Sequence, residues 1–248
     1  MRVWFAFAVF LLAASLAAQS TLVEQGRAAL DRNDPRTAVK LLEAAVAQTP
    51  QDADTHYFLG VAYGKLAEKS NVFRQAALAR RTRDQFERAV SLNPNHLDAR
   101  FSLVQYYMIA PNIYGGSEQK ALEEANEIAK RDAASGHRAL AFIHTRHRNY
   151  KAALAELEAA VALDPKDMPT WFEIGHVAAL SGLDLQQGEE ALLKYAEYTP
   201  SGDDPPLDRA FDWLAKIYER EGRPSDAARA EANAQRLAAR RGESGRVR

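Results

Sequence analysis

Three histidines in the middle of the sequence have side chains that a transition metal could use as ligands. His137 and His144 are seven residues apart, and His147 follows three residues later. Because an α-helix has 3.6 residues per turn, His137 and His144 would lie on nearly one face of a helix. Imidazole nitrogens are common ligands of transition metals. However, neither His137 nor His144 has an Asp or Glu in the same helical stretch to orient its ring, as metal-binding histidines usually do.

The sequence shows no arrangement typical of an active site. Cysteine is absent, which excludes a thiolate nucleophile, a thiolate metal site and a disulfide framework. The serine motif Gly-x-Ser-x-Gly is also absent. Acidic pairs at 123–124, 189–190 and 203–204 lie on expected solvent faces or in a loop. Gly115-Gly116-Ser117 lacks the GxxxxGK[ST] context of a phosphate-binding loop, so it predicts a loop-to-helix turn. We therefore expect no enzyme activity and no cofactor.

The histidines belong to a segment that reads as two short amphipathic helices, residues 134–165. Apolar residues recur at helical spacing on both sides of a polar turn at Arg148–Tyr150, and Pro165 ends the second helix. Neither helix can bury its apolar stripe alone, so the segment needs similar neighbours. The sequence supplies them as six helix-turn-helix units, at 21–50, 53–94, 97–132, 134–165, 168–200 and 208–237.

Small residues recur at matching positions of these units. The first helices have Gly26, Gly60, Ala141, Gly175 and Ala215, with Val104 as the exception, and the second helices open with Ala38, Ala121, Ala153, Gly188 and Ala227, with Thr82 as the exception. Trp171, and the prolines that close four units, complete the pattern. The pattern resembles the tetratricopeptide repeat family, whose unit has about 34 residues. The resemblance implies an all-α, right-handed α-solenoid over residues 19–240.

Two insertions interrupt the regular spacing. Pro50 and Pro94 are 44 residues apart, and the additional residues predict a longer second helix in the second unit. A segment around Pro111 and Gly115–Gly116 predicts an irregular turn before the next helix, which Ser117 can cap.

The resemblance also implies where a partner would bind, because the first helices of such repeats line a concave ligand surface. Four aromatic residues, Tyr57, Phe101, Phe142 and Phe172, would form a stripe for apolar side chains of a protein or peptide partner, unless they pack against the neighbouring unit. Arg138, His176 and Lys216 could meet a carboxylate. The predicted groove residues are Tyr57, Val61, Phe101, Gln105, Met108, Arg138, Phe142, Thr145, Phe172, His176, Asp212 and Lys216.

The repeat pattern gives the histidines a second interpretation. His137 and His144 fall at positions that the repeat uses for packing between its two helices, which favours a packing role. The expected function is therefore a non-enzymatic protein-interaction scaffold. The alternative is a small-ligand or metal-binding repeat protein that uses the groove or the His137/His144/His147 cluster.

The densest basic stretch within the repeats lies in the long helix of the second unit. It contains Arg74, Arg80, Arg81, Arg83 and Arg88. An acidic partner or an anionic membrane surface would suit these charges. A solvated helix is the other interpretation, since nearby Glu68, Asp84 and Glu87 offer local ion pairs.

The two ends of the sequence differ from the repeats. Residues 1–18 combine one arginine, an apolar run and small residues, which indicates a cleaved signal peptide; an uncleaved membrane anchor is the alternative. We therefore expect export, to the periplasm or beyond if the source is bacterial, with no membrane span after cleavage. Residues 241–248 read as a disordered basic tail. The net charge of −1 argues against nucleic-acid binding, and homo-oligomerisation through the terminal helices is possible.

Overall fold

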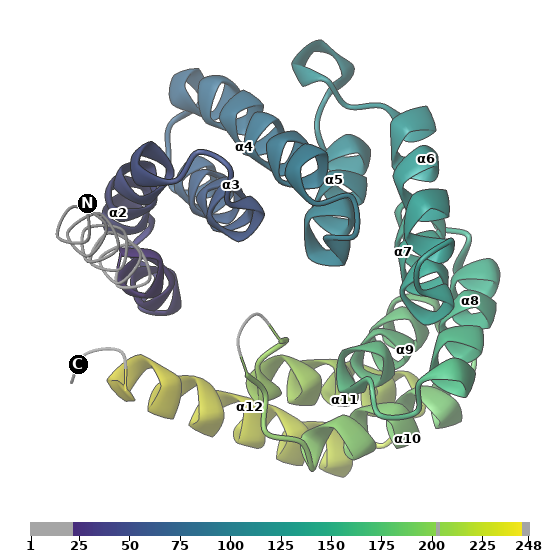
Figure 1. Cartoon of the computed structure of the whole chain (residues 1–248). Coiled ribbons are helices and arrows are strands. Elements are labelled where there is room, and N and C mark those ends of the chain that lie inside the picture. The colour runs from purple at the N-terminus through teal and green to yellow at the C-terminus, as the bar shows by residue number, and fades with distance from the viewer. Residues whose placement is uncertain (1–21, 202–203, 245–248) are drawn as a thin grey trace, which may run out of the picture. The chain divides into compact units, whose positions relative to one another are not determined.

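The computed structural model describes residues 22–201 and 204–244, and these residues form helices and connecting turns without a β-strand. The predicted all-α solenoid of six helix-turn-helix repeats is confirmed (Figure 1). The helices are residues 22–31, α2 (Pro35–Gln48), α3 (Ala53–Glu68), α4 (Val72–Leu92), α5 (Leu97–Ile109), the 3-10 helix η1 (Asn112–Tyr114), α6 (Glu118–Ala129), α7 (Ala133–Arg146), α8 (Tyr150–Leu163), α9 (Met168–Ser181), α10 (Leu185–Ala196), α11 (Leu207–Arg220) and α12 (Pro224–Ser244).

The chain consists of two compact units, which meet in sequence between Glu124 and Ala125. In the first unit, α2 packs on α3, α3 on α4, and α4 on α5. In the second unit each helix from α7 to α12 packs on the next, and α9 also contacts α11. The contact between α9 and α11 brings the first helices of two successive repeats together, so these helices share a surface.

The helix boundaries follow from local capping. The carboxylates of Asp34, Asp52 and Asp132 accept hydrogen bonds from backbone N–H groups three residues later, at the starts of α2, α3 and α7. The hydrogen bond from the Ser135 backbone lowers the pKa of Asp132 below its usual value. At the other end, α2 and α8 stop two residues before a proline, as the sequence predicted.

Glycine in the first helices permits close helix packing. A Cβ atom on Gly60 would lie 2.6 Å from the Phe86 ring, and one on Gly175 would lie 2.2 Å from Cγ of Leu192. Phe86 and Leu192 are buried side chains of the second helix of the same repeat. The small residues that defined the repeat are therefore the points at which its two helices touch.

Both predicted insertions have the expected form. α4 extends over 21 residues, longer than α2 or α8 with 14 each. Between α5 and α6 the backbone forms η1 and turns at Gly115, whose φ of 96° favours glycine. The Ser117 hydroxyl accepts a hydrogen bond from the Lys120 backbone at 3.4 Å at the start of α6.

The C-terminal prediction needs a correction. α12 continues to Ser244, beyond residue 237, where the last repeat was expected to end. Arg241 on this helix is fixed by an ion pair of 2.7 Å with Asp208, so the helix includes residues that were predicted to be disordered. Residues 1–18 and 245–248 lie outside the described part of the chain. Within that part, no helix is both long and apolar enough to cross a membrane.

Candidate partner-binding surface

Three side chains on α9 and α11 form a partly exposed cluster in the second unit. The imidazole of His176 lies 4.5 Å from the Trp213 indole, measured between ring centroids. Lys216 Nζ lies 3.9 Å from the centroid of the same indole, within cation–π range. Lys216 is exposed, whereas His176 and Trp213 are half-buried. We call these residues the His176–Trp213–Lys216 cluster.

The local sequence explains how the cluster is positioned. Leu214 and Ile217 are buried, which fixes α11 so that Asp212 and Lys216, one turn apart, face solvent. Glu173, one turn before His176 on α9, pairs with His176 Nδ1 at 3.1 Å. The cluster therefore presents an aromatic surface with a lysine and carboxylates around it.

The prediction for Phe172 is corrected by its burial. Phe172 is only 4% exposed and packs edge-on against Tyr195 of α10, with 5.3 Å between ring centroids. Its ring belongs to the core of the second unit, so it cannot present an apolar surface to a partner. Phe172 therefore does not belong to the predicted aromatic stripe.

The three predicted residues on α7 are all half-buried. Arg138 forms an ion pair with Asp167 at 3.1 Å, at the turn between α8 and α9. Arg138 is therefore paired with a carboxylate of the chain itself, whereas the sequence suggested that a partner would supply one. Phe142 and Thr145 lie on the same helix.

The first unit contains the other five predicted residues, and each is half-buried: Tyr57, Val61, Phe101, Gln105 and Met108. The Tyr57 ring lies 4.9 Å from His96 and 5.9 Å from Phe86, measured between centroids. Tyr57 thus joins α3 to the start of α5. It supports the packing of successive repeats as well as contributing to the surface.

A contact that the sequence analysis missed joins neighbouring repeats. The Tyr63 hydroxyl donates a hydrogen bond to Glu43 on the preceding helix at 2.5 Å, and the Tyr107 hydroxyl donates to Glu87 at 2.8 Å. In both pairs the glutamate precedes the tyrosine by 20 residues. That recurrence is a signal from which sequence reasoning could have found the contact.

A cation completes each of these contacts. The Arg81 guanidinium lies 5.5 Å from the Tyr63 ring centroid, and Lys120 Nζ lies 5.4 Å from that of Tyr107. Burial, followed by the hydrogen bond to Glu43, raises the pKa of Tyr63 to about 12. The same causes, with Glu87 as acceptor, raise the pKa of Tyr107.

The second unit repeats the arrangement with Tyr218. Its ring centroid lies 4.3 Å from the Arg223 guanidinium, which pairs with Glu189 of α10 at 2.7 Å. Burial first, and then Glu189, raises the pKa of Tyr218 to about 12. We call this three-part contact the Glu–Tyr–cation clamp.

Comparison with known proteins agrees with this architecture. Residues 23–68 match the family model described as tetratricopeptide repeat. The structure also resembles a tetratricopeptide repeat protein of Thermus thermophilus, with a TM-score of 0.62 and 17% identity, over 80% of this chain and 98% of that one. The chain therefore has the tetratricopeptide repeat fold, and its residues 23–68 match that family.

Two pilus proteins have similar folds. PilW, a type IV pilus biogenesis factor, has a TM-score of 0.58 and 15% identity, over 88% of this chain and 92% of its own. PilF of Pseudomonas aeruginosa has a TM-score of 0.56 and 13% identity, over 90% of this chain and 93% of its own. At these identities the likeness concerns the fold alone. No curated protein matches the sequence.

The fold favours interaction over catalysis, because tetratricopeptide repeat proteins are generally non-enzymatic scaffolds with protein partners. The histidines of the fourth tetratricopeptide repeat fit this interpretation. His137 Nδ1 bonds to Glu156 of α8 at 2.6 Å, so it links the two helices of its repeat. His144 is half-buried, and His147 is exposed after the end of α7. Among the described residues, no group of three or more His, Asp or Glu side chains is placed to hold a metal ion.

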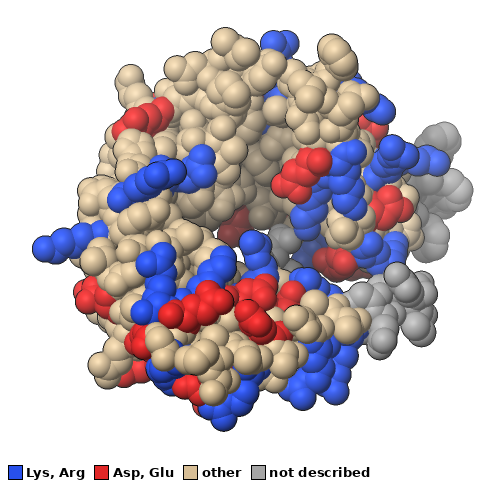
Figure 2. All heavy atoms as spheres, turned by 180° about the vertical axis from the view of Figure 1, so that it is seen from behind, with Lys and Arg blue, Asp and Glu red and all other residues tan. Residues whose placement is uncertain are grey.

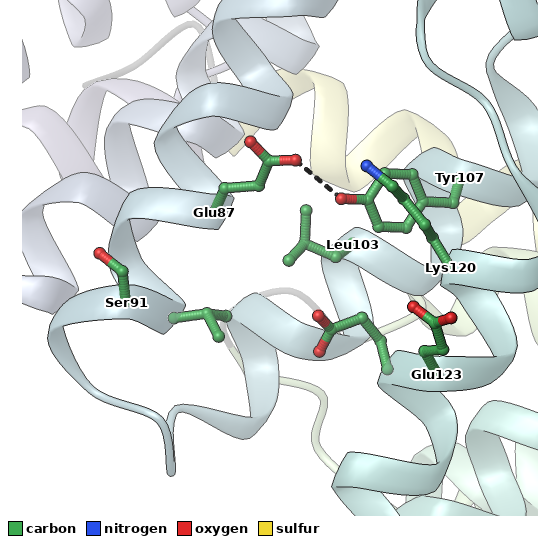
Figure 3. Close-up of a pocket in the computed structure, with 8 residues that line it drawn as sticks. Glu87, Ser91, Leu103, Tyr107, Lys120 and Glu123 are labelled. Atoms are coloured by element: carbon green, nitrogen blue, oxygen red, sulfur yellow. Dashed lines mark hydrogen bonds between the residues drawn. The ribbon is translucent and has the colours of Figure 1, made fainter.

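A pocket of about 330 Å³ opens in the first unit, between the second and third tetratricopeptide repeats. Figure 3 shows Tyr107 and Glu87 meeting across it, with Leu103 at its apolar floor and Lys120 near the Tyr107 ring. The remaining lining residues are Val90, Ser91, Glu123 and Glu124. The pocket is thus built around one Glu–Tyr–cation clamp.

Cations balance the carboxylates of this pocket. Glu124 forms an ion pair with buried Arg100, and Glu87 lies 3.7 Å from Nε of Arg83. The residues that line the pocket therefore serve mainly to join the two repeats. Elsewhere, Figure 2 shows basic and acidic side chains interspersed over the face in view, as the net charge of −1 leads one to expect.

Proposed function

We propose that this tetratricopeptide repeat protein is a non-enzymatic scaffold that binds a peptide or a partner protein on the surface formed by its first helices. The His176–Trp213–Lys216 cluster carries the proposal. Aromatic residues in partly exposed positions dominate protein interfaces, since they bury a large area with few rotatable bonds. Lys216 would meet a carboxylate of the partner, while the Trp213 indole would cover an apolar side chain.

Of the predicted residues only Asp212 and Lys216 are fully exposed, so we centre the proposed contact on α11 and the adjacent α9. Phe172 is in the core, and Arg138 is already paired with Asp167. Lys216 and Asp212 are exposed on α11, beside the half-buried indole. An extended peptide along this surface would find an apolar contact with charges of both signs beside it, which would set its orientation.

Site-specific photo-crosslinking in the native host tests the proposal. A photoreactive residue replaces Lys216 in one variant, and Glu190 in the other. Glu190 is an exposed residue of α10, the second helix of the preceding repeat, so it serves as the matched control. We expect a defined crosslinked product from position 216 and none of that product from position 190.

Each outcome of this experiment has a clear meaning. Equal crosslinking from both positions, or none from position 216, would overturn the placement of the contact. A product consisting of two copies of this chain would identify homo-oligomerisation as the interaction. Neither substitution should change the helical content, because both positions are exposed.

We also propose that the protein is exported. The support is the sequence of residues 1–18, with one arginine before the apolar run and small residues at its end. The mass of the protein purified from its host should show cleavage after Ala17 or Ala18, with the protein in the exported fraction. An intact N-terminus on a protein in the cytosolic fraction would contradict the proposal.

A further inference from the structure

Two adjacent apolar side chains project into solvent at the start of α4. Phe73 is 93% exposed and Val72 is 74% exposed. Single exposed apolar residues are common on protein surfaces, but Phe73 is the kind of large side chain whose near-complete exposure is unfavourable in water. The opposite side of α4 is buried through Leu78 and Phe86, so the packing of the helix fixes Phe73 outward.

Arginines continue the same face of the helix. Arg80 lies seven residues after Phe73, two turns along, and Arg81 and Arg88 flank the same exposed side. We call the surface of Phe73, Arg80, Arg81 and Arg88 the α4 outer face. Residues 69–92 contain six basic side chains and two acidic ones, although the whole chain has a net charge of −1.

The two acidic residues do not neutralise the α4 outer face. Asp84 is engaged by Arg83 at 2.7 Å, and Glu87 accepts the hydrogen bond of Tyr107. Arg81 is the cation of the clamp with Tyr63 and Glu43, but at 3.8 Å from Glu43 and with an exposed side chain its charge is offset only in part. Arg88 donates to Gln51, and this neutral group does not offset its positive charge. The outer face therefore carries surplus positive charge.

The turn after α5 adds further apolar side chains beside these arginines. The 3-10 helix η1 packs against α4, and the Arg80 guanidinium lies 6.0 Å from the Tyr114 ring centroid. Ile113, next to Tyr114, is 78% exposed, and Ile109 is 60% exposed. Arg80 of α4 thus lies next to η1, which contains the exposed Ile113.

We propose that the α4 outer face, together with η1, docks on the surface of an anionic lipid bilayer. Arginines near the membrane surface attract acidic headgroups. Projecting Phe73 and Ile113 can enter the interfacial region, as the apolar side chains of amphipathic surface helices do. The apolar side chains project instead of lining a recess, which favours a bilayer over a peptide as the occupant. The inference is independent of the proposed peptide contact, which lies on α9 and α11.

Vesicle co-sedimentation of the full chain tests the docking surface. The probes are phosphatidylcholine vesicles with and without phosphatidylglycerol. The apolar run of residues 3–18 has no charged side chain, so binding to the neutral vesicles measures its contribution. We expect additional binding to the anionic vesicles. Salt at about 0.5 M should remove it, because the shorter Debye length screens the attraction between the arginines and the acidic headgroups.

Matched variants locate the surface. Arg80→Glu should weaken the anion-dependent binding by about tenfold or more, since it reverses a charge. Phe73→Ser should weaken it by about tenfold, because the bilayer would no longer bury the apolar area of the ring. The controls in the second unit are Arg236→Glu, on the exposed side of α12, and Leu163→Ser, which changes a side chain that is 58% exposed.

Neither control should change binding by more than about twofold, which corresponds to roughly 0.4 kcal/mol. Equal binding to both kinds of vesicle, or equal losses in the controls and the α4 variants, would overturn the proposal. Binding of the α4 outer face to an acidic protein without binding to anionic vesicles would also overturn it. Circular dichroism should show unchanged helicity in all four variants, because the altered side chains are exposed.

Discussion

The hydroxyl of Tyr107 on α5 donates a hydrogen bond to Glu87 on α4, at 2.8 Å, across the junction of two repeats. The helices belong to successive repeats, so this bond helps to fix how one repeat stacks on the next. Tyr63 with Glu43 does the same at another junction, and Arg223 links Tyr218 to Glu189 at a third. In a solenoid, such nearest-neighbour contacts contribute a large part of the stability.

Removing the Tyr107 hydroxyl should therefore destabilise the first unit. We expect Tyr107→Phe to lower the free energy of unfolding by about 1 kcal/mol, the net worth of one hydrogen bond. Urea unfolding, followed by circular dichroism, measures the change. A double-mutant cycle with Glu87→Gln isolates the pair, and a coupling energy near zero would show that the bond does not stabilise the junction.

The stability should also depend on pH in the alkaline range. The pKa of Tyr63 is raised to about 12, whereas an unfolded tyrosine titrates near pH 10. Because the folded pKa is the higher one, the stabilisation is complete below about pH 10 and declines as the pH rises towards about 12. The free energy of unfolding should fall less steeply over this range in Tyr63→Phe than in the wild type. Parallel pH profiles would contradict this assignment.

A Cβ atom at the closest helix contact should be costly. Gly175→Ala would place its methyl group 2.2 Å from Cγ of Leu192, so either the buried Leu192 side chain or α10 must shift. We expect a loss of about 1–3 kcal/mol, as for other overpacked sites. The matched control is Gly64→Ala on α3, where the new Cβ would lie 3.7 Å from the nearest atom, of Thr82.

The control should be neutral, or stabilising by up to about 1 kcal/mol, because alanine is the better helix former. Thermal unfolding distinguishes the two variants. Similar melting temperatures for Gly175→Ala and Gly64→Ala would show that the repeat tolerates wider helix spacing.

Metal titration examines the alternative interpretation of the histidines. The ring of His137 is already engaged by Glu156, and His147 lies in the turn after α7. We therefore expect calorimetric titration with zinc to give no heat above background, for the wild type and for His144→Ala alike. Stoichiometric binding that His144→Ala abolishes would restore the metal site.

The sequence was sufficient to predict the repeats because each one carries its own local signals. Helical spacing of apolar residues, prolines after the second helices and small residues such as Gly60 and Gly175 all act within one repeat. The long α4 followed from the 44 residues between Pro50 and Pro94. These features need no knowledge of the neighbouring repeat.

Side-chain contacts between helices were harder to predict, both within a repeat and between repeats. Phe172 was expected on the surface, yet Tyr195 of the adjacent helix covers it. Trp213 was overlooked although its neighbours Asp212 and Lys216 were predicted, since only the packing of α11 on α9 shows that the indole reaches His176. The orientation of side chains at such junctions depends on the angle between helices, which periodicity does not determine.

The central claim is that the His176–Trp213–Lys216 cluster binds the partner, and calorimetry with the peptide recovered by crosslinking at position 216 tests it most directly. We expect Lys216→Glu to weaken binding about tenfold and Trp213→Ala about thirtyfold or more, as hot-spot residues do. The matched control is Lys194→Glu, because Lys194 also stacks on a tryptophan, with Nζ 3.6 Å from the Trp171 ring centroid, but lies on α10. Retained affinity in Lys194→Glu, with both losses in the cluster variants, is the predicted result. Affinities within about twofold of the wild type in folded Lys216→Glu and Trp213→Ala proteins would contradict the account.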